Sequence, residues 1–148
     1  MSATVAASPA DTGASSLPLR VALVGNPNTG KTTLFNRLCG ANAKTANFPG
    51  TTTAMRTGKS AASGAQPIEI IDLPGLYGLT STSPEARIVG DLLQGTGSLG
   101  APDAVVVLVD ATNLARNLVL VGELLSRAEP RSEEHTSELQ SRFGISYA

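Results

Sequence analysis

One eight-residue segment restricts the possible folds of this chain more than any other feature. Residues 25–32 read Gly-Asn-Pro-Asn-Thr-Gly-Lys-Thr and match the pattern G-x-x-x-x-G-K-[S/T]. The aliphatic run Leu19–Val24 before it predicts a buried strand, and Thr32–Cys39 after it predicts a helix that ends at Gly40. A strand, a glycine-rich loop and a helix in this order are typical of loops that bind phosphate groups.

The residue types in this segment suit a nucleoside triphosphate with Mg²⁺. Gly25 and Gly30 let successive backbone N–H groups curl around phosphate oxygens. The Lys31 ammonium would contact the β- and γ-phosphates, and the Thr32 hydroxyl is a hard oxygen ligand for Mg²⁺. The predicted nucleotide contacts here are Gly25, Asn26, Pro27, Asn28, Thr29, Gly30, Lys31, Thr32 and Thr33.

A second segment, Asp72-Leu73-Pro74-Gly75, follows the predicted buried strand Pro67–Asp72. Downstream of a phosphate-binding loop, the Asp72 carboxylate can hold Mg²⁺ through water, and the Gly75 N–H can meet the γ-phosphate. We therefore predict that this turn lies beside the nucleotide.

Leu76 stands after Gly75, where well-known GTPases carry the glutamine that orients the attacking water. A leucine side chain cannot orient water. If the chain hydrolyses a nucleotide, a monovalent cation, backbone groups or a partner must neutralise the developing charge, and Gln66 and Gln94 remain alternatives.

The segment Ala41–Thr53 shows no periodicity and predicts a long loop. Its part Asn47-Phe48-Pro49-Gly50-Thr51-Thr52 offers hydroxyl groups for the remaining metal position. Thr51, Thr52 and Thr53 are all chemically suitable, and the spacing alone does not choose among them.

The rest of the pattern alternates strands with helices. Ala54–Ser60 predicts a weak strand, and Ser83-Pro84-Glu85 predicts the start of a helix that ends at Gly95. Ala104–Val109 predicts a strand buried on both faces. The last predicted helix runs until Pro130, with Leu114, Leu118, Val121 and Leu125 as its apolar face. This alternation predicts an α/β fold with a mostly parallel sheet flanked by helices.

Composition excludes several classes of function. The chain has 148 residues, with 11 Lys and Arg against 12 Asp and Glu, so its charge gives no basis for binding nucleic acid or anionic membranes. One cysteine, Cys39, excludes an internal disulfide framework. The chain has no charged segment typical of a signal peptide, and its longest aliphatic run is far short of a membrane span. We predict a soluble, cytoplasmic polypeptide with a disordered leader over residues 1–18, rich in Ala, Ser, Thr, Gly and Pro.

Four segments together resemble one family. They read GNPNTGKTTLFN (Gly25–Asn36), NFPGTT (Asn47–Thr52), DLPGLYGL (Asp72–Leu79) and DATNLARNL (Asp110–Leu118). In this order they resemble the N-terminal G domain of ferrous iron transport protein B, FeoB, a bacterial membrane iron transporter. The resemblance covers residues 19–130 and implies a P-loop NTPase fold of the Ras-like G-domain type.

The resemblance also implies roles for particular residues. Lys31 and Thr32 would contact phosphate and Mg²⁺, Thr52 would be the switch I threonine, and Asp72 and Gly75 would be the switch II pair. Asn28 matches the asparagine linked to potassium-stimulated hydrolysis. The implied catalytic residues are Lys31, Asn28, Thr52 and Gly75. The implied Mg²⁺ ligands are Thr32, Thr52 and Asp72. The implied nucleotide contacts in the two switch segments are Gly50, Thr51, Thr52, Asp72, Leu73, Pro74 and Gly75.

Two departures concern the end of the chain. Such domains read guanine with an Asn-x-x-Asp motif that follows the last predicted helix. Here the last asparagine of the sequence is Asn117, inside that helix, so the motif is missing and the guanine specificity of GTP/GDP binding is implied by the family alone. Residues Arg131–Ser141 resemble a translated sequencing-library adapter, so we predict a partial G domain over residues 19–130 and a non-native tail over 131–148. We further expect the strand Ala104–Val109 to have one unpaired edge.

The resemblance implies a GTPase domain that regulates Fe(II) uptake through a membrane part not contained in this chain. The implied partners are a helical regulatory domain and a transmembrane iron-permeation domain, at the cytoplasmic face of the bacterial inner membrane. Two alternatives stay open: a soluble GTPase of the ribosome-assembly type, and a non-catalytic nucleotide-binding fragment.

Overall fold

The structure is a computed structural model that describes residues 17–60, 67–128 and 143–145. The predicted leader lies almost wholly outside the described residues, as does most of the predicted non-native tail. The elements follow in the order β1 (Leu19–Gly25), α1 (Lys31–Cys39), β2 (Ala43–Asn47), β3 (Ala54–Lys59), β4 (Ile68–Asp72), α2 (Pro84–Gln94), β5 (Ala104–Leu108), α3 (Leu114–Ala128) and β6 (Phe143–Ile145), with short 3-10 turns at Gly40–Asn42 and Ala111–Asn113.

A single mixed sheet has the strand order β2-β3-β4-β1-β5-β6. The central strand β1 pairs in parallel with β4 and with β5, whereas β2–β3 and β3–β4 are antiparallel pairs. The carboxyl ends of β1 and β4 therefore lie side by side at one edge of the sheet. This geometry brings the predicted phosphate-binding loop next to the turn that starts at Asp72.

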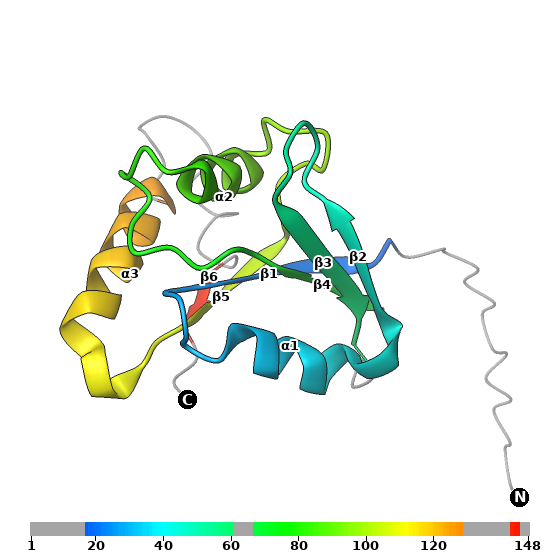
Figure 1. Cartoon of the computed structure of the whole chain (residues 1–148), viewed down its shortest axis with the longest axis horizontal. Coiled ribbons are helices and arrows are strands. Elements are labelled where there is room, and N and C mark those ends of the chain that lie inside the picture. The colour runs from blue at the N-terminus through cyan, green and yellow to red at the C-terminus, as the bar shows by residue number, and fades with distance from the viewer. Residues whose placement is uncertain (1–16, 61–66, 129–142, 146–148) are drawn as a thin grey trace, which may run out of the picture.

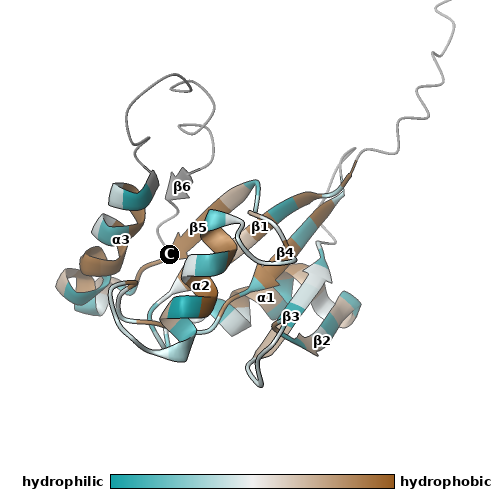
Figure 2. Cartoon of the chain, turned by 90° about the horizontal axis from the view of Figure 1, so that it is seen from above, coloured by the Kyte–Doolittle hydropathy of each residue, from teal (hydrophilic) through white to brown (hydrophobic). Residues whose placement is uncertain are grey.

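Helices cover both faces of the sheet (Figure 1). Because successive side chains of a strand point to opposite faces, Leu23 packs with Phe35 of α1 while its neighbours Ala22 and Val24 pack with α2 and α3. Figure 2 shows the hydrophobic residues gathered on the central strands and on the inner faces of the helices. Helix α1 thus lies on one face, and α2 and α3 lie on the other.

The start of α2 agrees with the sequence prediction. The Ser83 hydroxyl accepts a hydrogen bond from the Ala86 backbone N–H at 3.2 Å, Pro84 is the first helical residue, and Glu85 lies in the first turn. Gly95 ends the helix in the left-handed region at φ 69°. A single cap of this kind contributes about 1 kcal/mol.

The prediction of a loop over Ala41–Thr53 is wrong in part, because residues Ala43–Asn47 form β2. Among the described strands it is the outermost of the sheet, and it pairs with β3 from Ala43 opposite Gly58 to Asn47 opposite Ala54. Its last four residues are exposed, so no hydrophobic alternation marks it in the sequence.

The predicted apolar face of the last helix is also wrong at most positions. Leu114, Leu118 and Leu125 are exposed, and only Val121 of the predicted set is buried. The buried residues of α3 are Asn117, Leu120, Val121 and Leu124. The buried Asn117 side chain accepts a hydrogen bond from the Asp110 N–H at 3.2 Å and donates one to the Asn113 carbonyl at 2.8 Å. The buried face of α3 therefore includes a polar residue, which the pattern of apolar residues does not reveal.

The expectation of an unpaired edge at Ala104–Val109 is wrong as well. Strand β6 pairs in parallel with β5, with Val105 opposite Phe143 and Val107 opposite Ile145. These residues belong to the segment predicted as a non-native tail, so a short apolar run there supplies backbone partners to β5.

Candidate functional site

The loop of residues 25–32, called the phosphate loop below, connects β1 to α1 and has an unusual backbone. Asn28 and Gly30 both lie in the left-handed region, at φ 66° and φ 86°. Asn28 is the only described non-glycine residue with a positive φ. A loop of this shape turns consecutive N–H groups towards one concave side, where α1 also begins.

Gly25 is required by close packing. A Cβ atom at this position would lie 2.7 Å from the Leu108 carbonyl oxygen and 2.9 Å from the Thr29 hydroxyl. Any larger residue would therefore push the loop away from β5, and the loop geometry explains the first glycine of the motif.

The Lys31 side chain is buried, with 7% of its surface exposed, and folds back along the loop. Its Nζ donates a hydrogen bond to the Asn26 carbonyl at 3.2 Å, and the Thr29 hydroxyl donates to the same oxygen at 2.9 Å. Burial lowers the pKa of Lys31, and the nearby Asp72 carboxylate acts in the opposite direction. Lys31 Nζ is hydrogen-bonded to a neutral carbonyl, so a bound phosphate would give this buried ammonium a charged hydrogen-bond partner.

Asp72, at the end of β4, lies opposite the first turn of α1. The Thr32 hydroxyl donates a hydrogen bond to Asp72 Oδ2 at 3.4 Å, whereas Asp72 Oδ1 is buried without a partner among the described residues. Burial raises the pKa of Asp72, and Lys31, Arg56 and the Thr32 hydrogen bond lower it to a lesser extent.

An orphaned buried carboxylate oxygen beside a hydroxyl fits Mg²⁺, which prefers hard oxygen ligands. In the part of the chain that the structure describes, no group of three or more His, Cys, Asp or Glu could hold a metal ion. The hydroxyl of Thr32 and the carboxylate of Asp72 are oxygen ligands that suit a metal ion sharing its ligand shell with phosphate oxygens and water.

Gly75 lies against the phosphate loop. A Cβ atom there would lie 2.9 Å from the backbone nitrogen of Pro27 and 3.2 Å from Lys31 Nζ. Two backbone hydrogen bonds hold this turn to β1: Leu73 N–H to the Leu23 carbonyl at 3.3 Å and Leu76 N–H to the Gly25 carbonyl at 3.2 Å.

The Leu76 side chain is buried in the hydrophobic core between the sheet and helices α2 and α3. The two glutamines considered as alternatives do not fill its place. Gln94 is exposed at the far end of α2, and Gln66 lies outside the described residues.

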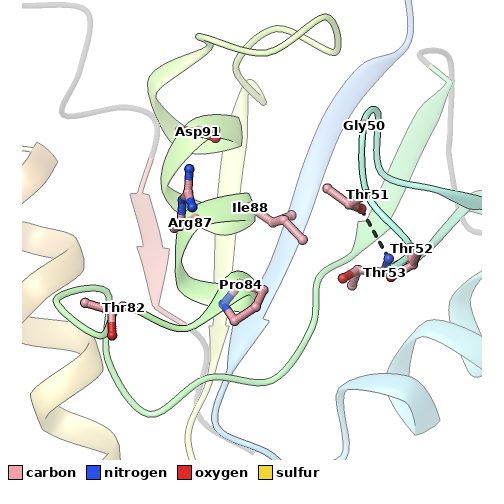
Figure 3. Close-up of a pocket in the computed structure, with 9 residues that line it drawn as sticks. All are labelled: Gly50, Thr51, Thr52, Thr53, Thr82, Pro84, Arg87, Ile88 and Asp91. Atoms are coloured by element: carbon pink, nitrogen blue, oxygen red, sulfur yellow. Dashed lines mark hydrogen bonds between the residues drawn. The ribbon is translucent and has the colours of Figure 1, made fainter.

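The threonines of the switch I loop, residues 47–53, do not join this assembly. Gly50, Thr51, Thr52 and Thr53 line a cavity of about 730 Å³ whose other wall is α2 (Figure 3). A separate cavity of about 330 Å³ is lined by Asn28, Gly30, Lys31, Thr32 and Thr33. The structure thus brings together the phosphate loop, Asp72 and Gly75, and leaves the predicted switch I ligand on another surface.

Arg56 lies beside the site, although no sequence motif marks it. On β3 it lies opposite Asp72 of β4, its Nη2 donates a hydrogen bond to Asn36 Oδ1 at 2.8 Å, and its guanidinium lies 4.9 Å from the centre of the Phe35 ring. Its charge lowers the pKa of Asp72. Only the register of the antiparallel pair β3–β4 could have revealed this neighbour.

Comparison with known proteins agrees with this geometry. A family model described as "Ferrous iron transport protein B", FeoB_N, matches residues 19–131. The chain belongs to the FeoB family. The Fe(2+) transporter FeoB of Campylobacter jejuni is 44% identical over 108 residues, which are 73% of this chain and 17% of that protein. The FeoB of Methanocaldococcus jannaschii is 42% identical over 105 residues, 71% of this chain and 15% of that protein.

Solved FeoB structures share the fold. A GDP-bound mutant of S. thermophilus NFeoB is 38% identical with a TM-score of 0.69, covering 86% of this chain and 43% of that chain. The G domain of the T. maritima FeoB iron transporter is 31% identical with a TM-score of 0.69, covering 88% of this chain and 87% of that chain. The chain therefore has the P-loop G-domain fold of FeoB and spans about a sixth of the curated relatives' length. None of its described helices has the length and apolar character needed to cross a membrane.

Proposed function

We propose that the phosphate loop binds a guanine nucleotide with Mg²⁺ and that this FeoB G domain hydrolyses GTP. The observation that carries the proposal is the convergence of Lys31, Thr32, Asp72 and Gly75 at the adjacent ends of β1 and β4. The GDP bound to the related S. thermophilus protein supports the choice of nucleotide.

Each residue of this group has a distinct task in the proposal. Backbone N–H groups of the phosphate loop, from Gly25 to Thr33, cradle the phosphates, and Lys31 exchanges its Asn26 carbonyl for phosphate oxygens. Thr32 and Asp72 hold Mg²⁺, Asp72 through water, and the ion would neutralise charge on the β- and γ-phosphates. The Gly75 N–H donates to the γ-phosphate, while Leu73 and Pro74 fix the turn that carries it.

Thr52 is proposed as the second hydroxyl ligand of Mg²⁺. To reach it, the switch I loop must leave the cavity that it shares with α2. Thr51 is less suited because its hydroxyl closes the loop itself. The hydroxyl donates to the Phe48 carbonyl at 3.0 Å. It also accepts from the Thr53 N–H at 3.2 Å, the dashed line in Figure 3.

Asn28 is proposed to bind K⁺ during hydrolysis. Leu76 is buried and cannot orient water, so another group must offset the charge that develops on the phosphates. The Asn28 side chain is exposed and lines the cavity of the phosphate loop, so its carbonyl oxygen is available to a cation at that position.

In the parent protein we propose that this domain regulates Fe(II) uptake from the cytoplasmic face of the bacterial inner membrane. The proposed partners are a helical regulatory domain and a transmembrane iron-permeation domain. Within the chain, residues 19–130 are proposed as the partial G domain and 131–148 as a non-native tail. A genomic read that continues unchanged through Arg131–Ser141 would contradict the assignment of residues 131–148 as a non-native tail.

The experiment follows phosphate release from Mg-GTP by the 148-residue chain in K⁺ and in Na⁺ at equal ionic strength. We expect faster release in K⁺, loss of this stimulation in Asn28→Ala, and unchanged stimulation in the control Asn42→Ala, an exposed asparagine of the Gly40–Asn42 turn. Equal rates in both salts would refute the role of Asn28.

One sequence observation favours a second function, a nucleotide-binding fragment without catalysis. The guanine-reading Asn-x-x-Asp motif does not occur after Asn117. Saturable GTP binding without phosphate release in either salt would favour this function, and equal binding of ATP and GTP would show that the chain does not read the base.

A further inference from the structure

Helix α3 contacts the switch II segment, residues 72–80, through three charged side chains. This segment leaves β4, runs along α3 and then enters α2 (Figure 1). The Arg116 guanidinium lies 4.5 Å from the centre of the Tyr77 ring. Glu123 accepts hydrogen bonds from the Leu79 backbone N–H and, at 2.9 Å, from the Thr80 hydroxyl. Arg127 Nη2 donates to the Leu79 carbonyl at 3.2 Å.

Together, Glu123 and Arg127 satisfy both backbone groups of Leu79. The N–H of this residue meets a carboxylate and its carbonyl meets a guanidinium, which are charge-assisted hydrogen bonds. The Leu79 side chain is buried in the core formed by α2 and α3. A residue fixed through its N–H, its carbonyl and its side chain cannot move unless α3 moves or releases it.

One glycine makes room for the Glu123 carboxylate. A Cβ at Gly78 would lie 3.0 Å from Glu123 Oε2 and 3.3 Å from its Oε1. A side chain at position 78 would compete with the carboxylate for the space beside Leu79. The close approach of Glu123 thus depends on the absence of a side chain at position 78.

The other end of the same segment touches the phosphate loop. Leu76 N–H donates to the Gly25 carbonyl at 3.2 Å, and Gly75 lies against Pro27 and Lys31. Only three residues lie between Gly75 and Leu79. Because Leu76 and Leu79 are both buried, this short stretch can change little in length between its contact with the phosphate loop and its contact with α3.

We propose that Glu123 and Arg127 are positioning residues that preorganise Gly75 for the γ-phosphate by holding Leu79. This inference rests on the proposed nucleotide site and adds α3 as an element that sets its preference between tri- and diphosphate. Binding of the diphosphate does not need the Gly75 N–H, so the loss of the α3 contacts weakens triphosphate binding selectively.

The first test measures the contact itself without nucleotide, as the hydrogen exchange rate of the Leu79 amide in the 148-residue chain. We expect faster exchange in Glu123→Ala and an intermediate rate in Glu123→Gln, whose amide oxygen still accepts one hydrogen bond. The control Glu69→Gln changes a carboxylate on β4 that pairs with Arg20 instead. An unchanged Leu79 rate in Glu123→Ala would contradict the contact.

The second test measures the affinities for a non-hydrolysable GTP analogue and for GDP, both with Mg²⁺. We expect the ratio of triphosphate to diphosphate affinity to fall by about tenfold in Glu123→Ala, the loss of one charge-assisted hydrogen bond. Arg127→Ala should lower the ratio in the same direction, and the control Arg37→Ala, on α1, should leave it unchanged. Glu123→Gln should restore part of the loss.

The outcomes separate the two claims. An unchanged or increased ratio in Glu123→Ala would overturn the positioning role and leave nucleotide binding intact. Failure of the wild-type chain to bind either nucleotide would overturn the proposed function and this inference with it. If Glu123→Ala does not fold, Gly78→Ala provides the second route, because its methyl group would lie 3.0 Å from Glu123 Oε2 and force the carboxylate to shift. It should lower the same ratio, and an unchanged ratio together with an unchanged Leu79 exchange rate would refute the proposal.

Discussion

The switch I loop and the switch II segment flank the same phosphate loop, yet they are attached to the fold in different ways. Switch II is bonded to β1 at Leu73 and Leu76 and to α3 at Leu79. Switch I is closed mainly on itself: Thr51 N–H donates to the Phe48 carbonyl at 3.0 Å, and Phe48 N–H donates to the Thr53 carbonyl at 2.9 Å. Its threonines face a wide cavity beside α2.

The difference shows how the proposed site would assemble. The phosphate loop and switch II already lie in contact, so their hydrogen bonds need little rearrangement when nucleotide binds. Switch I must move as a small unit around its buried residue Phe48. We therefore expect substitutions of Lys31 and Asp72 to weaken binding of both the di- and the triphosphate, and substitutions in switch I to affect only the triphosphate.

The largest effect is expected for Lys31→Ala. The substitution removes the buried ammonium of the phosphate loop, and we expect GDP and GTP affinities to fall about 100-fold, the loss of strong hydrogen bonds to a charged group. Titration of fluorescent GDP measures this. Lys59→Ala, an exposed lysine of β3, is the control and should bind as the wild type does. Wild-type nucleotide affinity in Lys31→Ala would contradict the proposal that the phosphate loop binds the nucleotide.

A smaller effect is expected for Asp72→Asn. It keeps the shape of the side chain but removes the charge that would hold Mg²⁺ through water, and such changes lower metal affinity by about 10–100-fold. The measurement is GDP binding across a Mg²⁺ titration. The Mg²⁺ midpoint should rise in Asp72→Asn and stay constant in Asp91→Asn, an exposed carboxylate of α2. An unshifted midpoint would contradict the assignment of Asp72.

The smallest and most selective effect is expected for Thr52→Val. Loss of its hydroxyl should weaken a GTP analogue by about tenfold and leave GDP binding unchanged, because only the triphosphate draws switch I to the metal. Thr51→Val should instead disturb the turn without this selectivity. Selective loss in Thr51→Val with none in Thr52→Val would exchange the roles of the two threonines.

The sequence predicted the preassembled part well because local rules determine it. A strand, a glycine motif and a helix cap are short-range features, and parallel pairing of β1 with β4 then places Asp72 beside Thr32. Ser83 capping α2 belongs to the same class of local signal.

The features that were missed depend on contacts between distant residues. Strand β2 is exposed and has no alternation, and the buried face of α3 includes Asn117, which bonds to the Asp110 N–H. Arg56 reaches Asp72 only through the β3–β4 register, and Glu123 reaches Leu79 across 44 positions of sequence. Periodicity does not contain this information.

The most direct test of the central claim is the map of amide protection that GDP with Mg²⁺ produces on the 148-residue chain. We expect slowed hydrogen exchange in residues 25–33 and around Asp72, with little change in residues 47–53. Saturable GDP binding that leaves the amides of residues 25–33 unprotected would contradict it.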